Sequence, residues 1–299
     1  MNRVRHFIEE HNYACWCGER AARQVCSQML GRRFAVLRCC VCGTQRILPK
    51  AIPTAGAAKE LYNQQQHTRA EMTSARATEN SRRILRRIER VGIEINSNST
   101  VLDVGCSEGL LLETIRSKFG CRVVGVDVDE RAIERARRDF PQVTFLCGLA
   151  QDLQGQLPRA DVVIASAILE HVVSPPEFVD QLARLLKPDG KLFLLTPNAA
   201  SLHYRLARSW WRELLAIGEL VFLFTPQSLS AVAEKSGLDV HRLATDYDYL
   251  IWPRLYLPRS LKSAAILPWS YLRAGVKAAC MALPHGQSGD ILFASLEKK

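Results

Sequence analysis

Six of the ten cysteines of this 299-residue chain lie within its first 42 residues. They form two close groups, CWCGE from Cys15 and CCVCGT from Cys39, and a glycine follows the last cysteine of each group. The C-x-x-C spacing of the second group is that of a zinc knuckle, whose turn directs two thiolates at one metal ion. The first group is one residue tighter than this spacing. The expected ligands of one structural Zn²⁺ are Cys15, Cys17, Cys39 and Cys42.

The alternative for this segment is a set of reduced thiols that bind no metal. Cys26 and Cys40 are spare cysteines that could replace a member of the four. A segment of about 50 residues has little apolar core of its own, so a metal ion is the favoured source of its stability. A closed four-sulfur site leaves no open coordination position, which predicts a structural metal and excludes a catalytic one.

The stretch VLDVGCSEG, residues 101–109, is the second place where residue types suggest chemistry. An apolar run ends in Asp103, and a short turn with Gly105 and Gly109 follows, through which a ligand can approach the backbone closely. Asp127 ends the next apolar run, 22 residues past Gly105. This spacing suits a carboxylate that accepts hydrogen bonds from ribose hydroxyls.

The turn lacks the G-x-G-x-x-G spacing that brings a pyrophosphate to the amino end of a helix. An acid followed by a short turn suits a nucleoside ligand with a cationic amino group and no phosphate. S-adenosylmethionine is such a ligand, and we expect it to bind here.

These residues need a scaffold, and from Thr100 onward near-continuous apolar runs alternate with amphipathic segments. Such alternation predicts a doubly wound, mostly parallel sheet, with the ligand beyond the carboxyl ends of its strands. The expected strands are 100–106, 121–129, 142–148, 161–167, 191–198, 238–246 and 289–299. The expected helices are 110–119, 130–140 and 175–190.

Several stretches, in this order, resemble class I S-adenosylmethionine-dependent methyltransferases, in particular small-molecule methyltransferases with an amino-terminal zinc ribbon. They are VLDVGCSEG, VVGVDVDE, ADVVIASAILEHV, LLKPDGKLFLLTPN and FTPQSLSAVAEKSGL. The resemblance covers roughly residues 80–245 and implies a Rossmann-like seven-stranded sheet whose last strand is antiparallel. Ser107 stands where the family's first motif has a glycine, and Leu149 where an acid contacts the adenine. The resemblance implies these cofactor-binding residues: Asp103, Gly105, Cys106, Gly109, Asp127, Val128, Leu149, Ala150 and Ser166.

Glu170 and His171, in LEHVV at the end of an expected strand, are the catalytic candidates. In the quinone O-methyltransferases that the chain resembles, this pair lies near the methyl acceptor, which implies a base for a hydroxyl group. The alternative is that His171 only caps or packs the following helix. Asn198, in TPNAASLHY, faces the substrate or holds a turn.

The expected organisation has three parts: a zinc-ribbon-like segment at 1–50, a linker and helix at 51–95, and the methyltransferase domain at 96–299. The helix ends before Gly92, and its arginines predict a solvated face. Residues 247–288 interrupt the domain with tryptophan and tyrosine among arginine and lysine. This insertion suits a peripheral contact with an anionic membrane surface, or a lid over the substrate.

The formal net charge of +10 is uneven, with +9 on residues 1–100, −4 on 101–190 and +5 on 191–299. Neither a signal peptide nor a membrane span is apparent, so we expect a cytoplasmic protein, with peripheral contact at the inner face of the membrane as an option. The favoured function is methyl transfer, most simply to oxygen, on a small-molecule, glycan or lipid-linked acceptor. Two alternatives stay open: an RNA methyltransferase, against which the missing aromatic stacking array argues, and a non-catalytic binding module.

Overall fold

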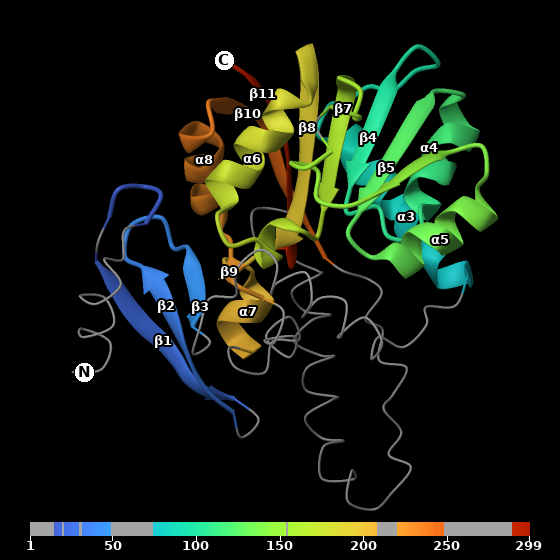
Figure 1. Cartoon of the computed structure of the whole chain (residues 1–299). Helices are drawn as coiled ribbons and strands as arrows, with labels where there is room; N and C mark the ends of the chain where they lie inside the picture. Colours follow the sequence, from blue (N-terminus) through green and yellow to red (C-terminus); the bar gives the residue numbers. More distant parts are fainter. Residues whose placement is uncertain are drawn as a thin grey trace, which may run out of the picture.

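The computed structural model describes residues 15–19, 21–29, 32–48, 74–153, 155–207, 220–247 and 289–299 (Figure 1). The expected linker and all but one residue of the expected insertion at 247–288 lie outside these ranges. None of the helices that the structure describes has both the length and the apolar character needed to cross a bilayer.

The larger sheet has seven strands and confirms the predicted fold class. Six strands run in the same direction, and β11 lies antiparallel to both of its neighbours, as the family resemblance implied. In spatial order the strands are β10 (Leu238–Asp246), β11 (Ile291–Lys298), β8 (Leu186–Pro197), β7 (Ala160–Ser166), β4 (Thr100–Val104), β5 (Arg122–Asp127) and β6 (Thr144–Cys147).

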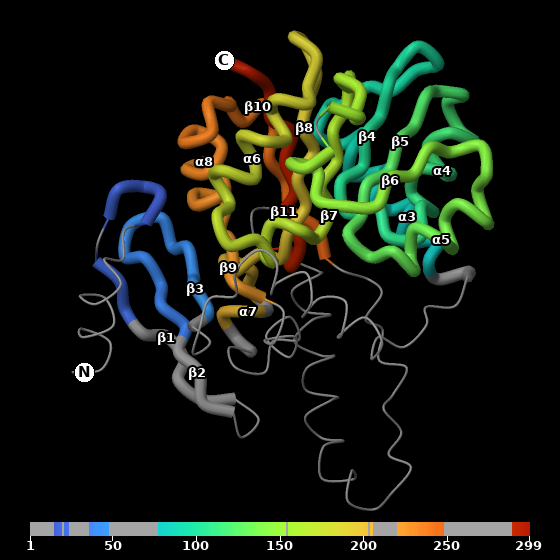
Figure 2. Tube along the Cα trace, viewed as in Figure 1, coloured from blue at the N-terminus to red at the C-terminus, as the bar shows by residue number. Residues whose placement is uncertain are grey.

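Helices cover both faces of this sheet, so its strands are buried on either side (Figure 2). Side chains of β4 show the alternation, since Val101 packs into one core cluster and Leu102 into the other. The helices of one face are α3 (Ser74–Arg90), α4 (Leu110–Phe119) and α5 (Glu130–Asp139). Those of the opposite face are α6 (Pro175–Arg184) and α8 (Pro226–Lys235). A 3₁₀ turn, η1 (Leu169–His171), and the short helix α7 (Leu202–Ala207) follow β7 and β8.

The helix expected over residues 175–190 is shorter, because α6 ends at Arg184 and β8 begins at Leu186. Leu186 pairs with Ala160 of β7, and Gly190 lies so close to that strand that an added Cβ would stand 2.8 Å from the Ala160 carbonyl oxygen. Lys187 forms an ion pair with Asp161 at 2.7 Å. Pairing with β7 therefore outweighs the helical pattern that ended in Gly190.

The arginines of α3 correct a second expectation, that of a solvated face. Arg83 and Arg87 are buried, and Arg87 forms a 3.3 Å ion pair with Asp246 at the end of β10. The guanidinium groups of Arg87 and Arg90 also lie over the ring of Phe293 in β11. Part of this arginine-rich face therefore packs against the sheet rather than facing water.

A second, four-stranded antiparallel sheet lies beside the first (Figure 1). We call residues 15–48 the ribbon; their strands are β1 (Ala22–Met29), β2 (Arg32–Cys39) and β3 (Gln45–Leu48). The fourth strand, β9 (Phe222–Leu223), comes from the segment between α7 and α8 and pairs with β3. The ribbon thus shares a sheet with a strand of the larger domain.

Candidate functional site

The candidate site lies at the carboxyl ends of β4, β5, β7 and β8, which all point to the same edge of the sheet. The chain runs outward from β4 through β5 to β6, and then continues with β7 and β8 on the other side of β4. The switch point is therefore between β4 and β7, where ligands of doubly wound sheets bind.

The turn after β4 requires glycine at two of its positions. Gly105 has a φ of 83°, and a Cβ there would stand 2.3 Å from Cδ1 of Ile168. Gly109, with a φ of 78°, begins α4, and a Cβ there would stand 2.4 Å from the ring of Phe145. The amide of Gly105 donates to the carbonyl of Val126 at 2.7 Å. The turn is thus held tightly against β5, and the side chain of Ile168 packs directly on the backbone of Gly105.

Asp127 ends β5 directly beside this turn. Its Oδ2 accepts a 2.8 Å hydrogen bond from the backbone N–H of Ser107, and its Oδ1 accepts one of 2.9 Å from the N–H of Asp129. Burial raises the pKa of Asp127, and these two hydrogen bonds partly oppose that shift. A carboxylate oxygen can accept two hydrogen bonds, so each oxygen of Asp127 keeps acceptor capacity for a ligand.

Asp103, at the carboxyl end of β4, is buried, with 3% of its surface exposed. Among the residues that the structure describes, its Oδ1 has no hydrogen-bond partner. Burial, and secondly the charge of Asp127, raises the pKa of Asp103 to about 7. An unpaired buried carboxylate of this kind costs free energy, which a cationic ligand would repay. The donor set therefore fits the amino group of S-adenosylmethionine.

The remaining expected cofactor residues line the same edge of the sheet. Cys106 is buried in the turn, and its sulfur lies 2.7 Å from where a Cβ of Gly125 would be. Val128 follows Asp127, and Ala150, which is largely buried, follows Leu149 in the loop after β6. Ser166 ends β7 opposite Leu195 of β8. The structure therefore brings together, at one edge, the residues that the sequence had spread over four strands.

Glu170 and His171 form the last two residues of η1, immediately after β7. Glu170 is buried, and its Oε2 accepts a 2.9 Å hydrogen bond from the hydroxyl of Thr196 in β8. Its Oε1 lies 4.0 Å from Nε2 of His171. The turn therefore holds a buried carboxylate beside an imidazole. Thr196 was not identified from the sequence, because a single threonine in an apolar strand carries no signal of a functional contact.

Asn198 holds a turn in this structure. Its side-chain Nδ2 donates to the carbonyl of Gly289 at 2.7 Å, and its Oδ1 accepts from the N–H of Ala200 at 2.9 Å. These bonds join the end of β8 to the segment that leads into β11. Of the two roles considered for Asn198, the structure supports the structural one.

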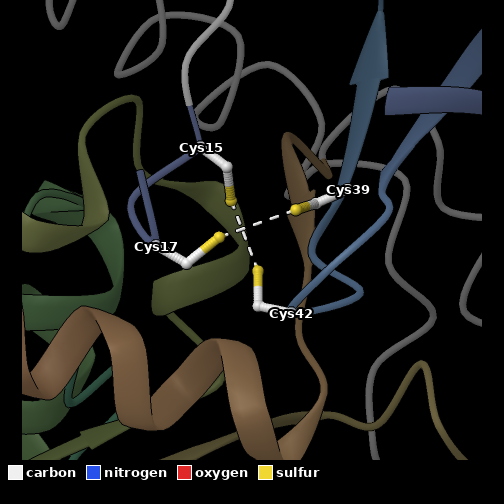
Figure 3. Close-up of side chains that lie close together, drawn as sticks. All are labelled: Cys15, Cys17, Cys39 and Cys42. Atoms are coloured by element: carbon white, nitrogen blue, oxygen red, sulfur yellow. Dashed lines mark hydrogen bonds between the residues drawn. The ribbon is translucent and has the colours of Figure 1, made fainter. Parts of the chain in front are cut away.

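The four cysteines expected to bind metal converge at one point (Figure 3). Their sulfur atoms all lie within 4.8 Å of one another, with 3.3 Å between Cys15 and Cys42 and 3.6 Å between Cys17 and Cys39. A cluster of four thiols at this separation is compatible with a structural zinc ion. Cys40 is exposed on the knuckle and is no part of this cluster, and the side chain of Cys26 lies outside the described residues.

Trp16, between two of these cysteines, was not singled out from the sequence. Its ring stacks on Phe224 at a centroid distance of 5.8 Å and tilts against Phe222 at 4.8 Å. Both phenylalanines belong to the larger domain, so the cysteine loop packs into that domain's core. A tryptophan within a metal-binding loop is a signal that could have indicated such packing.

Comparison with known proteins agrees with this geometry. Residues 74–243 match the family described as "Methyltransferase domain". The chain is 31% identical over 157 residues to the mitochondrial ubiquinone biosynthesis O-methyltransferase of Bos taurus, covering 48% of this chain and 42% of the relative. It is 30% identical over 167 residues to the ubiquinone biosynthesis O-methyltransferase of Neisseria meningitidis serogroup C, covering 49% of this chain and 70% of the relative.

The fold also matches solved structures. One is the magnesium protoporphyrin IX methyltransferase of Synechocystis PCC 6803 with bound S-adenosylhomocysteine, at a TM-score of 0.52. This match has 11% sequence identity and covers 82% of this chain and all of the other, so it shows the shared fold alone. The family match extends over more than half of the chain and includes the glycine turn, Asp127 and the Glu170–His171 turn. The chain therefore belongs to the methyltransferase-domain family, among the class I S-adenosylmethionine-dependent methyltransferases.

Proposed function

We propose that this protein transfers the methyl group of S-adenosylmethionine to an oxygen atom of a small-molecule acceptor. The observation that carries the proposal is the juxtaposition, at the carboxyl edge of one sheet, of an unpaired buried Asp103 with the Glu170–His171 turn. The relatives named O-methyltransferases favour oxygen as the accepting atom.

The cofactor side of the site consists of the turn after β4 and the end of β5. Asp103 would bind the amino group of the cofactor, and Asp127 the ribose hydroxyls. The loop at Leu149 and Ala150 would contact the adenine. The bound cofactor supplies an electrophilic methyl group on a sulfonium centre.

The acceptor side is formed by η1. His171 would take the proton from an acceptor hydroxyl as its oxygen displaces the sulfur from the methyl carbon, and the carboxylate of Glu170 would stabilise the resulting imidazolium. The hydroxyl of Thr196 orients that carboxylate through a 2.9 Å hydrogen bond. Much of the rate enhancement of such a displacement comes from holding the two reactants in line.

We further propose that Cys15, Cys17, Cys39 and Cys42 bind one Zn²⁺ that stabilises the ribbon. Four sulfur ligands would leave the ion no open position, so its contribution is structural.

The acceptor class that we favour is a glycan or a lipid-linked molecule, with peripheral contact to an anionic membrane. The support is the composition of residues 247–288, in which aromatic and basic residues alternate. Vesicle sedimentation tests the membrane contact: binding to anionic vesicles should weaken with salt and with replacement of the basic residues by glutamine. Equal sedimentation by the two proteins would count against it.

Methyl-labelled cofactor and fractionated cell extract test the function directly. Label should enter a small-molecule, glycan or lipid fraction with the wild type, and much less should enter with Asp127→Ala at a cofactor concentration below its Kd. Label in RNA would replace the proposal with the nucleic-acid alternative. A protein that binds the cofactor and transfers no label to any fraction would be a binding module.

A further inference from the structure

Residues 220–225, which we call the linking segment, contact both the ribbon and the Glu170–His171 turn. The segment includes β9, in which Phe222 pairs with Arg46 and Leu223 with Gln45 of β3. It then continues into α8, which begins at Pro226. The linking segment therefore connects the ribbon to the Glu170–His171 turn.

On the ribbon side, both cysteine loops touch the linking segment. Trp16, between Cys15 and Cys17, packs its ring on Phe222 and Phe224. The hydroxyl of Thr225 donates a 2.6 Å hydrogen bond to the backbone carbonyl of Cys42. Each half of the four-cysteine cluster therefore has its own contact with the segment.

On the acceptor side, the segment holds the backbone of the turn. The N–H of Val221 donates to the carbonyl of Glu170 at 2.8 Å, and the carbonyl of Val221 accepts from the N–H of Ile47 in β3 at 2.9 Å. Val221 thus lies directly between a ribbon strand and the proposed catalytic turn. Phe224 adds a second connection, because its carbonyl accepts from the N–H of Ala199, just after β8, at 2.7 Å.

We propose that the ribbon is a positioning element for the Glu170–His171 turn, and that Trp16 and Thr225 act as positioning residues through the linking segment. The consequence for catalysis rests on the proposed function, since it requires the turn to receive the acceptor. Four metal-bound thiolates would fix the loop of Trp16 and the carbonyl of Cys42. The metal would thereby support the acceptor side of the site without touching any reacting atom.

The cofactor side of the site serves as a control within the same protein. The hydrogen bonds of Asp127 run to Ser107 and Asp129, on the opposite side of the switch point from the linking segment. Loosening the ribbon should therefore change the acceptor side and leave cofactor affinity intact.

Residue-resolved amide hydrogen exchange tests this connection without an acceptor. In Trp16→Ala, and in wild type after metal removal by a chelator, exchange at Val221 and Ile47 should rise about tenfold or more, while Ser107 and Asp129 keep their protection. Trp16→Phe, which preserves an aromatic contact, should behave like the wild type. Unchanged protection at Val221, or an equal rise at all four amides, would overturn the proposal.

Thr225 gives a second variant with matched controls. Its hydroxyl also accepts from the N–H of Ser228 and caps α8. Thr225→Val loses both bonds, Thr225→Ser keeps them, and Ser228→Ala disturbs only the cap. We expect faster exchange at Val221 in Thr225→Val alone. The same increase in Ser228→Ala would assign the effect to the helix cap and overturn the role of the Cys42 contact.

Kinetics then separate the two proposals. With an acceptor in hand, Trp16→Ala should lower turnover by about 10- to 100-fold with unchanged cofactor affinity, as expected when a catalytic turn is misplaced. Unchanged turnover would contradict a positioning role. A wild-type protein that methylates nothing would refute the proposed function, and the exchange data would still decide whether the ribbon positions the turn.

Discussion

The backbone N–H of Ser107 donates a 2.8 Å hydrogen bond to Oδ2 of Asp127, which joins the turn after β4 to the end of β5. Ser107 adopts a positive φ of 49°, an uncommon conformation for a residue with a side chain. The bond holds the carboxylate in place before a ligand arrives, and such preorganisation reduces the cost of binding.

Asp127→Ala should weaken the binding of S-adenosylmethionine. Hydrogen bonds to a charged group contribute about 1.5–3 kcal/mol, so we expect the Kd from calorimetry to rise roughly 10- to 150-fold. Asp129→Asn is the control, because it changes the neighbouring carboxylate while preserving the cap that Asp129 provides to α5. Equal affinities of wild type and Asp127→Ala would remove Asp127 from the cofactor site.

Gly105→Ala should strongly weaken cofactor binding, although it adds only one methyl group. The new methyl group combines a positive φ with a contact of 2.3 Å to Ile168, so the side chain of Ile168 must shift and the backbone of the turn is strained. Gly120→Ala is a matched control, because Gly120 also has a positive φ but no described residue lies within 4 Å of its added Cβ. A similar loss of affinity in both variants would show that backbone strain alone, and not the close approach at Gly105, is responsible.

Asp103 should make the stability of the cofactor-free protein depend on pH. Its pKa of about 7 in the folded protein exceeds that of an unfolded aspartate, near 3.9, so the folded state holds the proton more tightly. The stabilisation is complete below about pH 4 and is lost as pH rises through 7. Relative to Asp103→Asn, the free energy of unfolding should fall by roughly 2–3 kcal/mol between pH 5 and pH 8. Parallel urea titrations of the two proteins would show no such difference if Asp103 were already ionised at pH 5.

The titration of Asp103 should also make cofactor affinity depend on pH. An ammonium ligand favours the ionised form of Asp103, so affinity should increase about tenfold from pH 6 to pH 8. Asp103→Asn should bind more weakly and show a nearly flat profile over this range. A wild-type profile as flat as that of the variant would place the amino group of the cofactor elsewhere.

His171→Ala should lower turnover by about 10²–10⁴-fold on a hydroxyl acceptor, because a general base typically contributes that much. Cofactor affinity should not change. Glu170→Gln should also lower turnover, since the amide no longer stabilises a protonated imidazole, and Thr196→Val should have a smaller effect in the same direction. Full activity of His171→Ala would assign the turn to positioning alone.

The purified protein should contain about one zinc ion per chain. Cys17→Ser should lose it, whereas Cys40→Ser, an exposed neighbour of the cluster, should retain it. Elemental analysis of both variants is the measurement. Full zinc content in Cys17→Ser would require a different ligand set.

Much of the fold follows from local patterns in the sequence. The apolar runs that became β4, β5 and β7 were recognisable because both faces of a central parallel strand are buried. Helix α4 was recognisable from the helical spacing of its apolar residues, and Leu111, Leu112 and Ile115 are indeed buried. Asp103 and Asp127 could be placed together because acids at the carboxyl ends of adjacent parallel strands meet at one edge.

What the sequence did not reveal depends on contacts between distant segments. The burial of Arg87 depends on Asp246 and Phe293, which come from β10 and β11, far along the chain from α3. The pairing of β3 with β9 joins the ribbon to a two-residue strand, which is too short to show the alternation of apolar and polar residues that predicts a strand. The hydrogen bond between Thr196 and Glu170 likewise joins two separate strand ends. Local patterns carry no information about such partners.

The place of β11 between β8 and β10 has a consequence for biosynthesis. On the ribosome, β8 and β10 emerge well before residues 291–298, so each presents an unpaired edge until β11 is made. Nascent chains that stall in this interval expose backbone donors and acceptors beside apolar side chains such as Leu192 and Leu194, which are fully buried in the finished sheet. Such open edges are templates for aggregation. The protein should therefore depend most on chaperones in the interval between the emergence of β10 and that of β11.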